Sequence, residues 1–519
     1  MLKNNKKYLL LLFFILAIAA FLRFWQLGSI PPGLWPDETA YANDALESLE
    51  TGSFKIFYPD NHGREGLFMW ILAFSFSLFG VSILSFKIIP ATIGVLTVLG
   101  QYLLCLEIFR FLNLEEKKVK LIALLSSFFI AISFWHINFS RIGFRAILTP
   151  LILVFSFYFF FRASRTKKLL DFILSGLIFG LGFYTYISFR LAVIVIAFLL
   201  IFWFFVALKR NWQKKYIVSA LFLSLAIIFI ALPIGIYFLN HPQDFISRSI
   251  GVSIFEEKNP LKLFVKNLGI HLLMFNFRGD VNLRHNLSGF PQLSPLAGIF
   301  FLIGIIWCFY QIIYFKNNQI NKIERMGVSL FLLIWFLSLL LPSVLTTEGI
   351  PHALRPIGVI PVSYIFSGLG AYLFYEWIKG KIKVPLLNSL SFLLLILMLI
   401  SSFVMYFLVW AKNPKLEDAF TIKFFDVGKE LNNIPEKTRK YVIKNEGDLP
   451  TEVSRFIQKT QGRNDAIYVE PEKLETINFL SGDFVFTMNK DLNPLKSLLE
   501  RFPKGNLIEK DRIWIFEIF

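Results

Sequence analysis

Apolar runs of about 20 residues recur along this chain, and they constrain its fold more than any other feature. Twelve runs are delimited roughly as 8–27, 67–80, 86–109, 119–137, 146–161, 169–188, 190–208, 216–239, 294–315, 326–345, 356–376 and 385–410. A helix needs about 20 predominantly apolar residues to cross the hydrocarbon core of a bilayer. Hydrophobic residues make up 55% of the 519 residues, a composition that excludes a soluble protein. We therefore predict a polytopic α-helical membrane protein.

Loop charge decides how many of these runs span the membrane. Residues 411–519 carry 18 Lys+Arg and 18 Asp+Glu, so the whole formal charge of +17 lies in residues 1–410. Lys and Arg collect in cytoplasmic loops, and the shortest run, 67–80, suits the membrane interface better than a span. Leaving it out gives about eleven spans and places five Lys/Arg-rich loops inside, namely Arg110–Lys120, Arg162–Lys168, Lys209–Lys215, Lys316–Arg325 and Glu376–Lys383. The positive charge is thus topological and does not indicate a nucleic-acid partner.

The same topology defines the domains. Residues 1–410 form the transmembrane domain, in which the first outer loop (28–85, with interfacial helices) and the long loop 240–293 lie outside. Residues 411–519 share that face and form a small α/β domain. In it "RKYVIKNEG", "NDAIYVE" and "RIWIFEIF" predict strands, and "TEVSRFIQKT" and "NPLKSLLERF" predict helices. Both cysteines, Cys105 and Cys308, fall in apolar runs and predict neither a disulfide nor a metal cluster.

The first outer loop is unusually acidic, with seven of the 18 acids of residues 1–410. Asp44, Glu47 and Glu50 are explained by a solvated helix that starts at Pro36, because acidic residues favour the N-terminal part of a helix. They therefore need no functional role.

Three other acids of this loop lie where charge comes close to lipid. Asp37 and Glu38 follow the end of the first span, and Glu65 precedes the interfacial run. A carboxylate at that depth needs a reason, so we predict Asp37, Glu38 and Glu65 as catalytic residues. Together with His62 they could also hold a divalent metal ion, although no dedicated ligand motif is present.

Arg and His side chains gather in three further outer loops, "HINFSRIGFR", "NFRGDVNLRHN" and "TTEGIPHALRP". A single interfacial Arg is usually an anchor that extends its charge to water. Three clusters fit a phosphate site better, since Arg binds phosphate oxygens in a bidentate manner. The predicted phosphate-binding residues are Arg141, Arg145, Arg278, Arg284, His285, His352 and Arg355.

One reaction uses both the acidic residues and the basic residues. A sugar on a polyprenyl phosphate has a good leaving group that needs cationic stabilisation, and the acceptor hydroxyl needs a base such as a carboxylate. The alternative is a transporter or flippase of polyprenyl-linked sugars, which would carry polar or broken helices at the bilayer midplane. Here the polar residues gather at the outer ends of the spans, with few exceptions, so the pattern favours an enzyme.

Four motifs in order resemble the GT-C membrane glycosyltransferases, specifically the family 39 group with protein O-mannosyltransferases and the lipid A aminoarabinose transferase. They are "WPDE" after the first span, Glu65 before an interfacial helix, "FSRIGFRAILTP" and "PHALRPIGVIP". The resemblance covers most of residues 1–376. One departure is "HGREGL", where relatives often have His-Pro-Pro, and it predicts an unusual acceptor subsite.

The resemblance implies a GT-C catalytic domain over residues 1–410 and a catalytic base at Asp37, with Glu38 supporting the site. It implies an inverting transferase that moves a sugar from a polyprenyl-phosphate donor to a hydroxyl of a lipid, glycan or protein acceptor. The expected location is the plasma (inner) membrane, with the site and residues 411–519 on the extracytoplasmic side. No cofactor beyond the metal ion mentioned above is expected.

Overall fold

The structure is a computed structural model that describes residues 2–246, 251–314 and 320–519. Residues 247–250 of the loop predicted to lie outside and 316–319 of the predicted inner loop Lys316–Arg325 lie outside the described residues.

Long apolar helices dominate the molecule and make it an integral membrane protein. Within the described residues nine helical segments are long and apolar enough to cross a membrane. Their helices are α1 Leu2–Phe24, α4 Ile83–Arg110, α7 Leu148–Thr166, α9 Ala192–Lys209, α10 Gln213–Asn240, α13 Pro295–Ile313, α14 Ile320–Val344, α15 Ile360–Lys379 and α16 Val384–Phe403. Short 3-10 helices precede three of them, at Arg145–Ile147 before α7, Ile187–Leu191 before α9 and Ile357–Val359 before α15, and a π-helix, Val404–Trp410, continues α16.

Two shorter helices complete the bundle. Helix α5 (Glu116–Ala131) packs against α4 and α15, and α8 (Leu169–Leu181) packs against α7 and α10. The loop charges predicted about eleven spans, whereas nine segments of the described residues are long and apolar enough to cross a membrane. The apolar run predicted to lie in the interface forms α3 (Leu67–Phe79), which at 13 residues is as short as α8.

Glycines let two helix pairs of the bundle approach closely. Gly176 and Gly180, four residues apart on α8, lie against backbone carbonyls of α10, so a Cβ at either position would collide with α10. Gly304 of α13 and Gly370 of α15 each face a backbone carbonyl of the other helix in the same way. Small residues at such contacts increase van der Waals packing, which holds membrane helices together in lipid.

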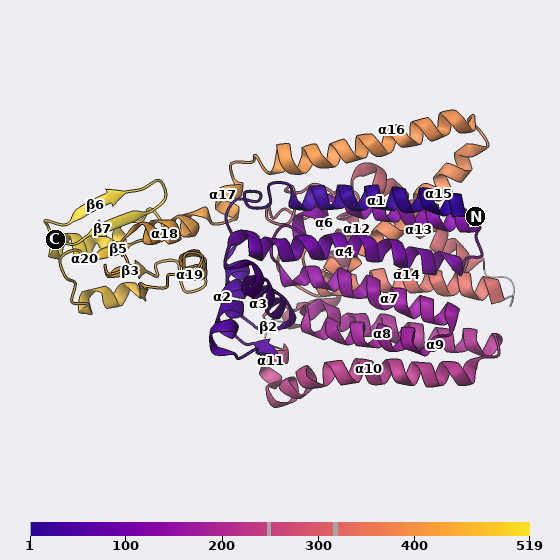
Figure 1. Ribbon diagram of the computed structural model, residues 1–519, viewed down its shortest axis with the longest axis horizontal. Helices are drawn as coiled ribbons and strands as arrows, with labels where there is room; N and C mark the ends of the chain where they lie inside the picture. The colour runs from indigo at the N-terminus through magenta and orange to yellow at the C-terminus, as the bar shows by residue number, and fades with distance from the viewer. Residues whose placement is uncertain (1, 247–250, 315–319) are drawn as a thin grey trace.

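The two ends of the bundle differ in what they carry (Figure 1). The N-terminus lies at one end. The opposite end carries α2 (Pro36–Thr51), α3, the hairpin of β1 (Phe57–Tyr58) and β2 (Arg64–Glu65), and the C-terminal sheet. The remaining short helices are α6 Phe134–Phe139, α11 Pro242–Ile246, α12 Pro260–Leu273 and α17 Leu416–Ala419.

The C-terminal part contains a five-stranded mixed sheet of order β4-β3-β5-β7-β6. Its elements are α18 Ile422–Asn433, β3 Lys440–Ile443, α19 Thr451–Lys459, β4 Ala466–Val469, β5 Phe484–Phe486, α20 Lys496–Arg501, β6 Asn506–Glu509 and β7 Trp514–Glu517. Strand β3 is parallel to β4 and β5, whereas β7 is antiparallel to β5 and β6. The three predicted strands and two predicted helices are confirmed, while α18, β5 and β6 were not predicted.

Helix α19 joins this sheet to the first loop. Phe456 of α19 packs against Phe76 of α3 and Phe86 of α4, with ring centroids 6.1 and 6.2 Å apart. Asn43 of α2 donates a hydrogen bond of 2.6 Å to the carboxylate of Glu452. The C-terminal part therefore braces α2, the helix that carries the acidic motif.

The bundle supports a topology prediction. A reporter fused after Phe519 should lie outside, and one inserted in Lys209–Lys215 should lie in the cytoplasm, because Lys-rich loops are retained there. Alkaline phosphatase and fluorescent-protein fusions measure the two sides. Reporters on one common side would contradict the eleven-span arrangement.

Candidate active site

The start of α2 fixes Glu38 inside the protein. Pro36 occupies the first turn of α2, a position that needs no backbone N–H. Glu38, three residues after Trp35, accepts the Trp35 backbone N–H at 2.8 Å and the Gly143 backbone N–H at 2.7 Å. Burial raises the pKa of Glu38, and the ammonium of Lys87 and the two N–H donors oppose this rise. One carboxylate oxygen thus caps the start of α2, and the other joins α2 to the loop before α7.

Asp37 is next to Glu38 but remains partly exposed. One carboxylate oxygen accepts the indole N–H of Trp35 at 3.1 Å, and the other accepts the side-chain amide of Asn61 at 2.9 Å. Each carboxylate oxygen can accept two hydrogen bonds. The Asp37 carboxylate is therefore oriented by the protein and can still receive a proton from a hydroxyl.

Arg284 brings a positive charge to the same place. Its guanidinium carbon lies 3.4 Å from the ring centroid of Trp35. Burial lowers the pKa of Arg284, and the carboxylates of Asp37, Glu38 and Asp280 oppose that effect. No hydrogen bond links this guanidinium to another described residue. Trp35 thus donates a hydrogen bond to the Asp37 carboxylate and packs its ring against the Arg284 guanidinium.

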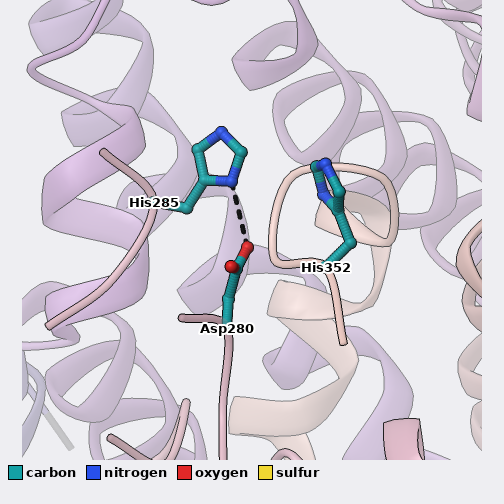
Figure 2. Close-up of side chains that lie close together, drawn as sticks. All are labelled: Asp280, His285 and His352. Carbon is teal, nitrogen blue, oxygen red and sulfur yellow. Dashed lines mark hydrogen bonds and ion pairs between the residues drawn. The ribbon is translucent and has the colours of Figure 1, made fainter. Parts of the chain in front are cut away.

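Asp280, His285 and His352 form a cluster of side chains that lie close together (Figure 2). The carboxylate of Asp280 accepts two hydrogen bonds, one from His285 Nδ1 at 3.0 Å and one from the backbone N–H of Ala353 at 2.8 Å. The two imidazole rings have centroids 4.9 Å apart. The cluster therefore ties the loop of Arg284 to the loop after α14.

The same three residues satisfy the distance requirement for a metal site, since their ligand atoms lie within 4.8 Å of one another. Their hydrogen bonds argue against that use. His352 Nδ1 accepts the backbone N–H groups of Leu354 and Arg355 at 3.1 and 3.3 Å, so the proton of the neutral ring is on Nε2. Burial lowers the pKa of His352 well below its usual value, and the neighbouring imidazoles and guanidiniums lower it further. A neutral Nε2–H donor near two arginines fits an anion better than a cation.

The structure does not bring together the predicted metal-binding set of Asp37, Glu38, His62 and Glu65. Among the described residues, the potential ligand atoms that lie within 4.8 Å of one another belong to Asp280, His285 and His352. His62 is exposed in the hairpin turn, and Glu38 and Glu65 are buried among their own partners.

Glu65 and Arg145 form a buried ion pair next to the hairpin. Arg145 Nε donates to the Glu65 carboxylate at 3.1 Å, and its other nitrogens donate to the Tyr41 hydroxyl at 2.8 Å and the Gly63 carbonyl at 3.2 Å. Both side chains are at most 3% exposed. Arg190 adds a second, longer contact to Glu65 at 3.9 Å. With Arg145 in this position, a phosphate would have to displace these partners to bind its guanidinium.

The remaining predicted cations occupy different surroundings. Arg141 is buried and donates five hydrogen bonds to carbonyls at and after the C-terminus of α1, between Leu22 and Ile30. Arg355 is partly exposed and donates to the Thr346 hydroxyl and the Glu348 carbonyl. Arg278 is exposed and has no side-chain partner within the described part of the chain.

Four residues of this region were not predicted from the sequence. Trp35 and Asn61 hold Asp37, Asp280 holds His285, and the buried ammonium of Lys87 donates to the Pro31 carbonyl at 3.1 Å and lies near Glu38. Two of them carried a sequence signal. Lys87 is a charge inside an apolar run, and Asp280 is the single acid of the basic segment "NFRGDVNLRHN".

The sequence matches no protein-family model and no curated protein. It is similar in structure to ArnT from Cupriavidus metallidurans bound to undecaprenyl phosphate, with a TM-score of 0.50 and 11% identity over 99% of this chain and 98% of that one. The apo state of ArnT gives a TM-score of 0.50 and 10% identity over the same shares. The Archaeoglobus fulgidus oligosaccharyltransferase in complex with Zn and sulfate gives 0.48 and 16% identity over 83% of this chain, which spans 60% of that longer one. The likeness to ArnT shows the GT-C-like fold.

Proposed function

We propose that the protein is a GT-C glycosyltransferase of the family 39 type that transfers a sugar from a polyprenyl-phosphate donor to an acceptor hydroxyl. The observation that carries this proposal is the pair of opposite charges on Trp35. Asp37 accepts its indole N–H, and the guanidinium of Arg284 lies over its ring without a hydrogen bond to any other described residue. A base and a cation beside each other are what the displacement of a lipid phosphate requires.

In the proposed reaction, the acceptor oxygen attacks the anomeric carbon while its proton passes to Asp37. The bond between the anomeric carbon and the phosphate oxygen breaks, and its electron pair leaves with the lipid phosphate. Arg284 stabilises the charge that develops on that oxygen. Because attack and departure occur on opposite sides of the carbon in one step, the configuration inverts.

The other predicted residues fall into two groups, those that can extend the phosphate site and those that hold the site in place. His352 and Arg355 lie on the loop that Asp280 and His285 tie to the loop of Arg284, and they and the exposed Arg278 can extend the phosphate site. Glu38, Arg141 and the Glu65–Arg145 pair form hydrogen bonds to protein groups and hold in place the segments that form the site.

The lipid part of the proposal has two supports. ArnT, whose fold this chain resembles, is seen bound to undecaprenyl phosphate. The candidate site here lies at the end of a bundle of apolar membrane helices, so a polyprenyl tail can stay in lipid while its phosphate reaches Arg284. We propose the outer face of the plasma membrane as the location, on the basis of the loop charges.

The proposal is tested by incubating membranes that contain the protein with a panel of radiolabelled polyprenyl-phosphate sugars and separating the products. We expect label to move from at least one lipid donor to a new acceptor and to be absent from control membranes. A labelled donor that only changes leaflet, without a new product, would indicate the flippase alternative.

Changing Arg284 to Gln should raise the KM for the donor or lower kcat. Loss of a charge-assisted hydrogen bond to phosphate corresponds to about 10- to 100-fold in kcat/KM. Initial rates over a range of donor concentrations measure this effect. Arg501→Gln is the matched control, since Arg501 is exposed on the C-terminal part. Equal kinetics for Arg284→Gln and wild type would exclude Arg284 from donor binding.

A further inference from the structure

The last membrane segment ends in the π-helix Val404–Trp410, which continues α16. The backbone N–H of Ala411 donates to the carbonyl of Tyr406, five residues earlier, as is typical of this geometry. Turns of this kind are rare and occur frequently at functional sites. The chain then passes through α17, which lies between the bundle and the C-terminal sheet (Figure 1). The contacts of this π-helix lead to the loop that carries Arg284.

Trp410, the last residue of the π-helix, holds this loop at the position before Arg284. Its indole N–H donates to the carbonyl of Leu283 at 2.7 Å, and its side chain is fully buried. The Trp410 ring packs against Tyr406 and Phe134, with ring centroids 4.7 and 5.8 Å away. Because these contacts fix the orientation of the indole, they also fix the Leu283 carbonyl that it binds.

Asn138 of α6 holds the next carbonyl of the same loop. Its side-chain N–H donates to the carbonyl of Arg284 at 2.6 Å, and its side-chain oxygen accepts the Tyr406 hydroxyl at 3.3 Å. The backbone N–H of Arg284 donates to the side-chain oxygen of Asn282 at 3.0 Å. Both backbone groups of Arg284 are therefore hydrogen-bonded, and the π-helix supports one of these bonds through Tyr406.

The chain that follows the π-helix also reaches the loop before Trp35. Phe420 packs against Trp410 with ring centroids 6.2 Å apart. The hydroxyl of Thr421 donates to the carbonyl of Leu34 at 3.3 Å, directly before Trp35 in the sequence. The continuous segment from Trp410 to Thr421 thus contacts both loops that meet at the proposed guanidinium–indole contact.

We propose that Trp410 and Asn138 are positioning residues, which hold Arg284 where its guanidinium meets the phosphate of the donor. This inference rests on the proposed function. A cation stabilises a leaving group best when it is already in place, and a displacement of about 1 Å can lower a rate by about 10²-fold. Trp35 contacts the guanidinium end of Arg284, whereas Trp410 and Asn138 hold its backbone end. Both residues act through Arg284 and do not contact the donor.

The first test measures the position of the loop and needs no donor. Trp410→Phe keeps an aromatic ring and removes the N–H that binds the Leu283 carbonyl. Hydrogen exchange of the full-length protein in detergent, read by mass spectrometry, should become about 5-fold faster in peptides that contain Arg284, the scale of one lost hydrogen bond. Peptides of the C-terminal sheet should keep their exchange rates. Unchanged exchange around Arg284, or an equal increase throughout the chain, would overturn the proposal.

Trp335→Phe is the matched control. Trp335 is also fully buried, and its indole N–H donates to the carbonyl of Gly358 at 2.9 Å within the bundle. The control removes the same kind of hydrogen bond and should leave exchange around Arg284 unchanged. Asn138→Ala removes the second bond to the loop and should also speed exchange around Arg284, so it provides the test if Trp410→Phe does not fold.

The second test is a double-mutant cycle with Arg284→Gln in the transfer assay. Because Trp410 acts through Arg284, Trp410→Phe should lower kcat/KM about 10-fold in the wild-type background and less than about 2-fold in Arg284→Gln. Trp335→Phe should change kcat/KM by one common factor in both backgrounds. A common factor for Trp410→Phe would refute the positioning role alone. Wild-type kinetics for Arg284→Gln, or no transfer by the wild type, would instead refute the proposed function.

Discussion

Replacing Asp37 with Asn should lower the rate of sugar transfer by about 10²- to 10⁴-fold, which is the usual contribution of a general base. Asn keeps the size of the side chain and can still accept the indole N–H of Trp35, so the start of α2 should stay in place. Donor binding should change little, because the cation that binds phosphate in our proposal is Arg284. Single-turnover rates and donor titrations on the same preparation separate the two effects.

Glu47→Gln is the matched control for Asp37→Asn. Glu47 lies on the same helix, is exposed and forms a surface salt bridge of 3.1 Å with Lys55. Such pairs contribute about 0–1 kcal/mol, so its activity should equal that of the wild type. Wild-type activity in Asp37→Asn would remove Asp37 from catalysis and make Glu38 or Glu65 the next candidate.

Glu65→Gln should destabilise the protein by about 3–5 kcal/mol, because it leaves the buried guanidinium of Arg145 without its counter-charge. Arg145 retains the Tyr41 hydroxyl and the Gly63 carbonyl, but neither carries a negative charge. Thermal unfolding in detergent measures the loss. The same measurement on Glu47→Gln should show a change below about 1 kcal/mol.

The double variant Glu65→Gln/Arg145→Met separates structure from catalysis at this pair. Removing both charges should restore a large part of the stability, since the penalty arises from the unpaired charge. If the pair only supports the site, transfer activity should recover with stability. A stable double variant that remains inactive would instead show that Glu65 acts in the reaction.

Several features of the fold were predictable because they depend on local composition. The apolar runs identified the membrane helices, and the shortest run forms α3, which is not among the segments long enough to span. The strands β3, β4 and β7 were recognisable from runs of β-branched and aromatic residues. Strands β5 and β6 were missed: "FVF" has three residues, and "NLIE" has one β-branched residue.

One expectation about the first loop was wrong. Asp44 was assigned to the solvated face of a surface helix, but it is 8% exposed and binds Arg64 through both oxygens, at 2.8 and 3.2 Å. Burial raises its pKa to about 6, and Arg64 opposes the rise. Glu47 and Glu50 are exposed as expected. The hairpin that brings Arg64 over α2 is formed by two-residue strands, which left no pattern in the sequence.

The sequence by itself determined the membrane class and the acidic loop where Asp37 is found, because hydrophobic length and charge are local properties. The tertiary structure decided which charged groups remain available for chemistry. Successive helical residues are rotated by about 100°, so Asp37 stays partly exposed on Trp35 while Glu38 turns inward to Gly143. Arg141 and Arg145 are used by partners about 80 to 120 residues away in the chain. A hydrogen bond or ion pair needs groups within about 3–4 Å, and only the folded chain brings such distant groups that close.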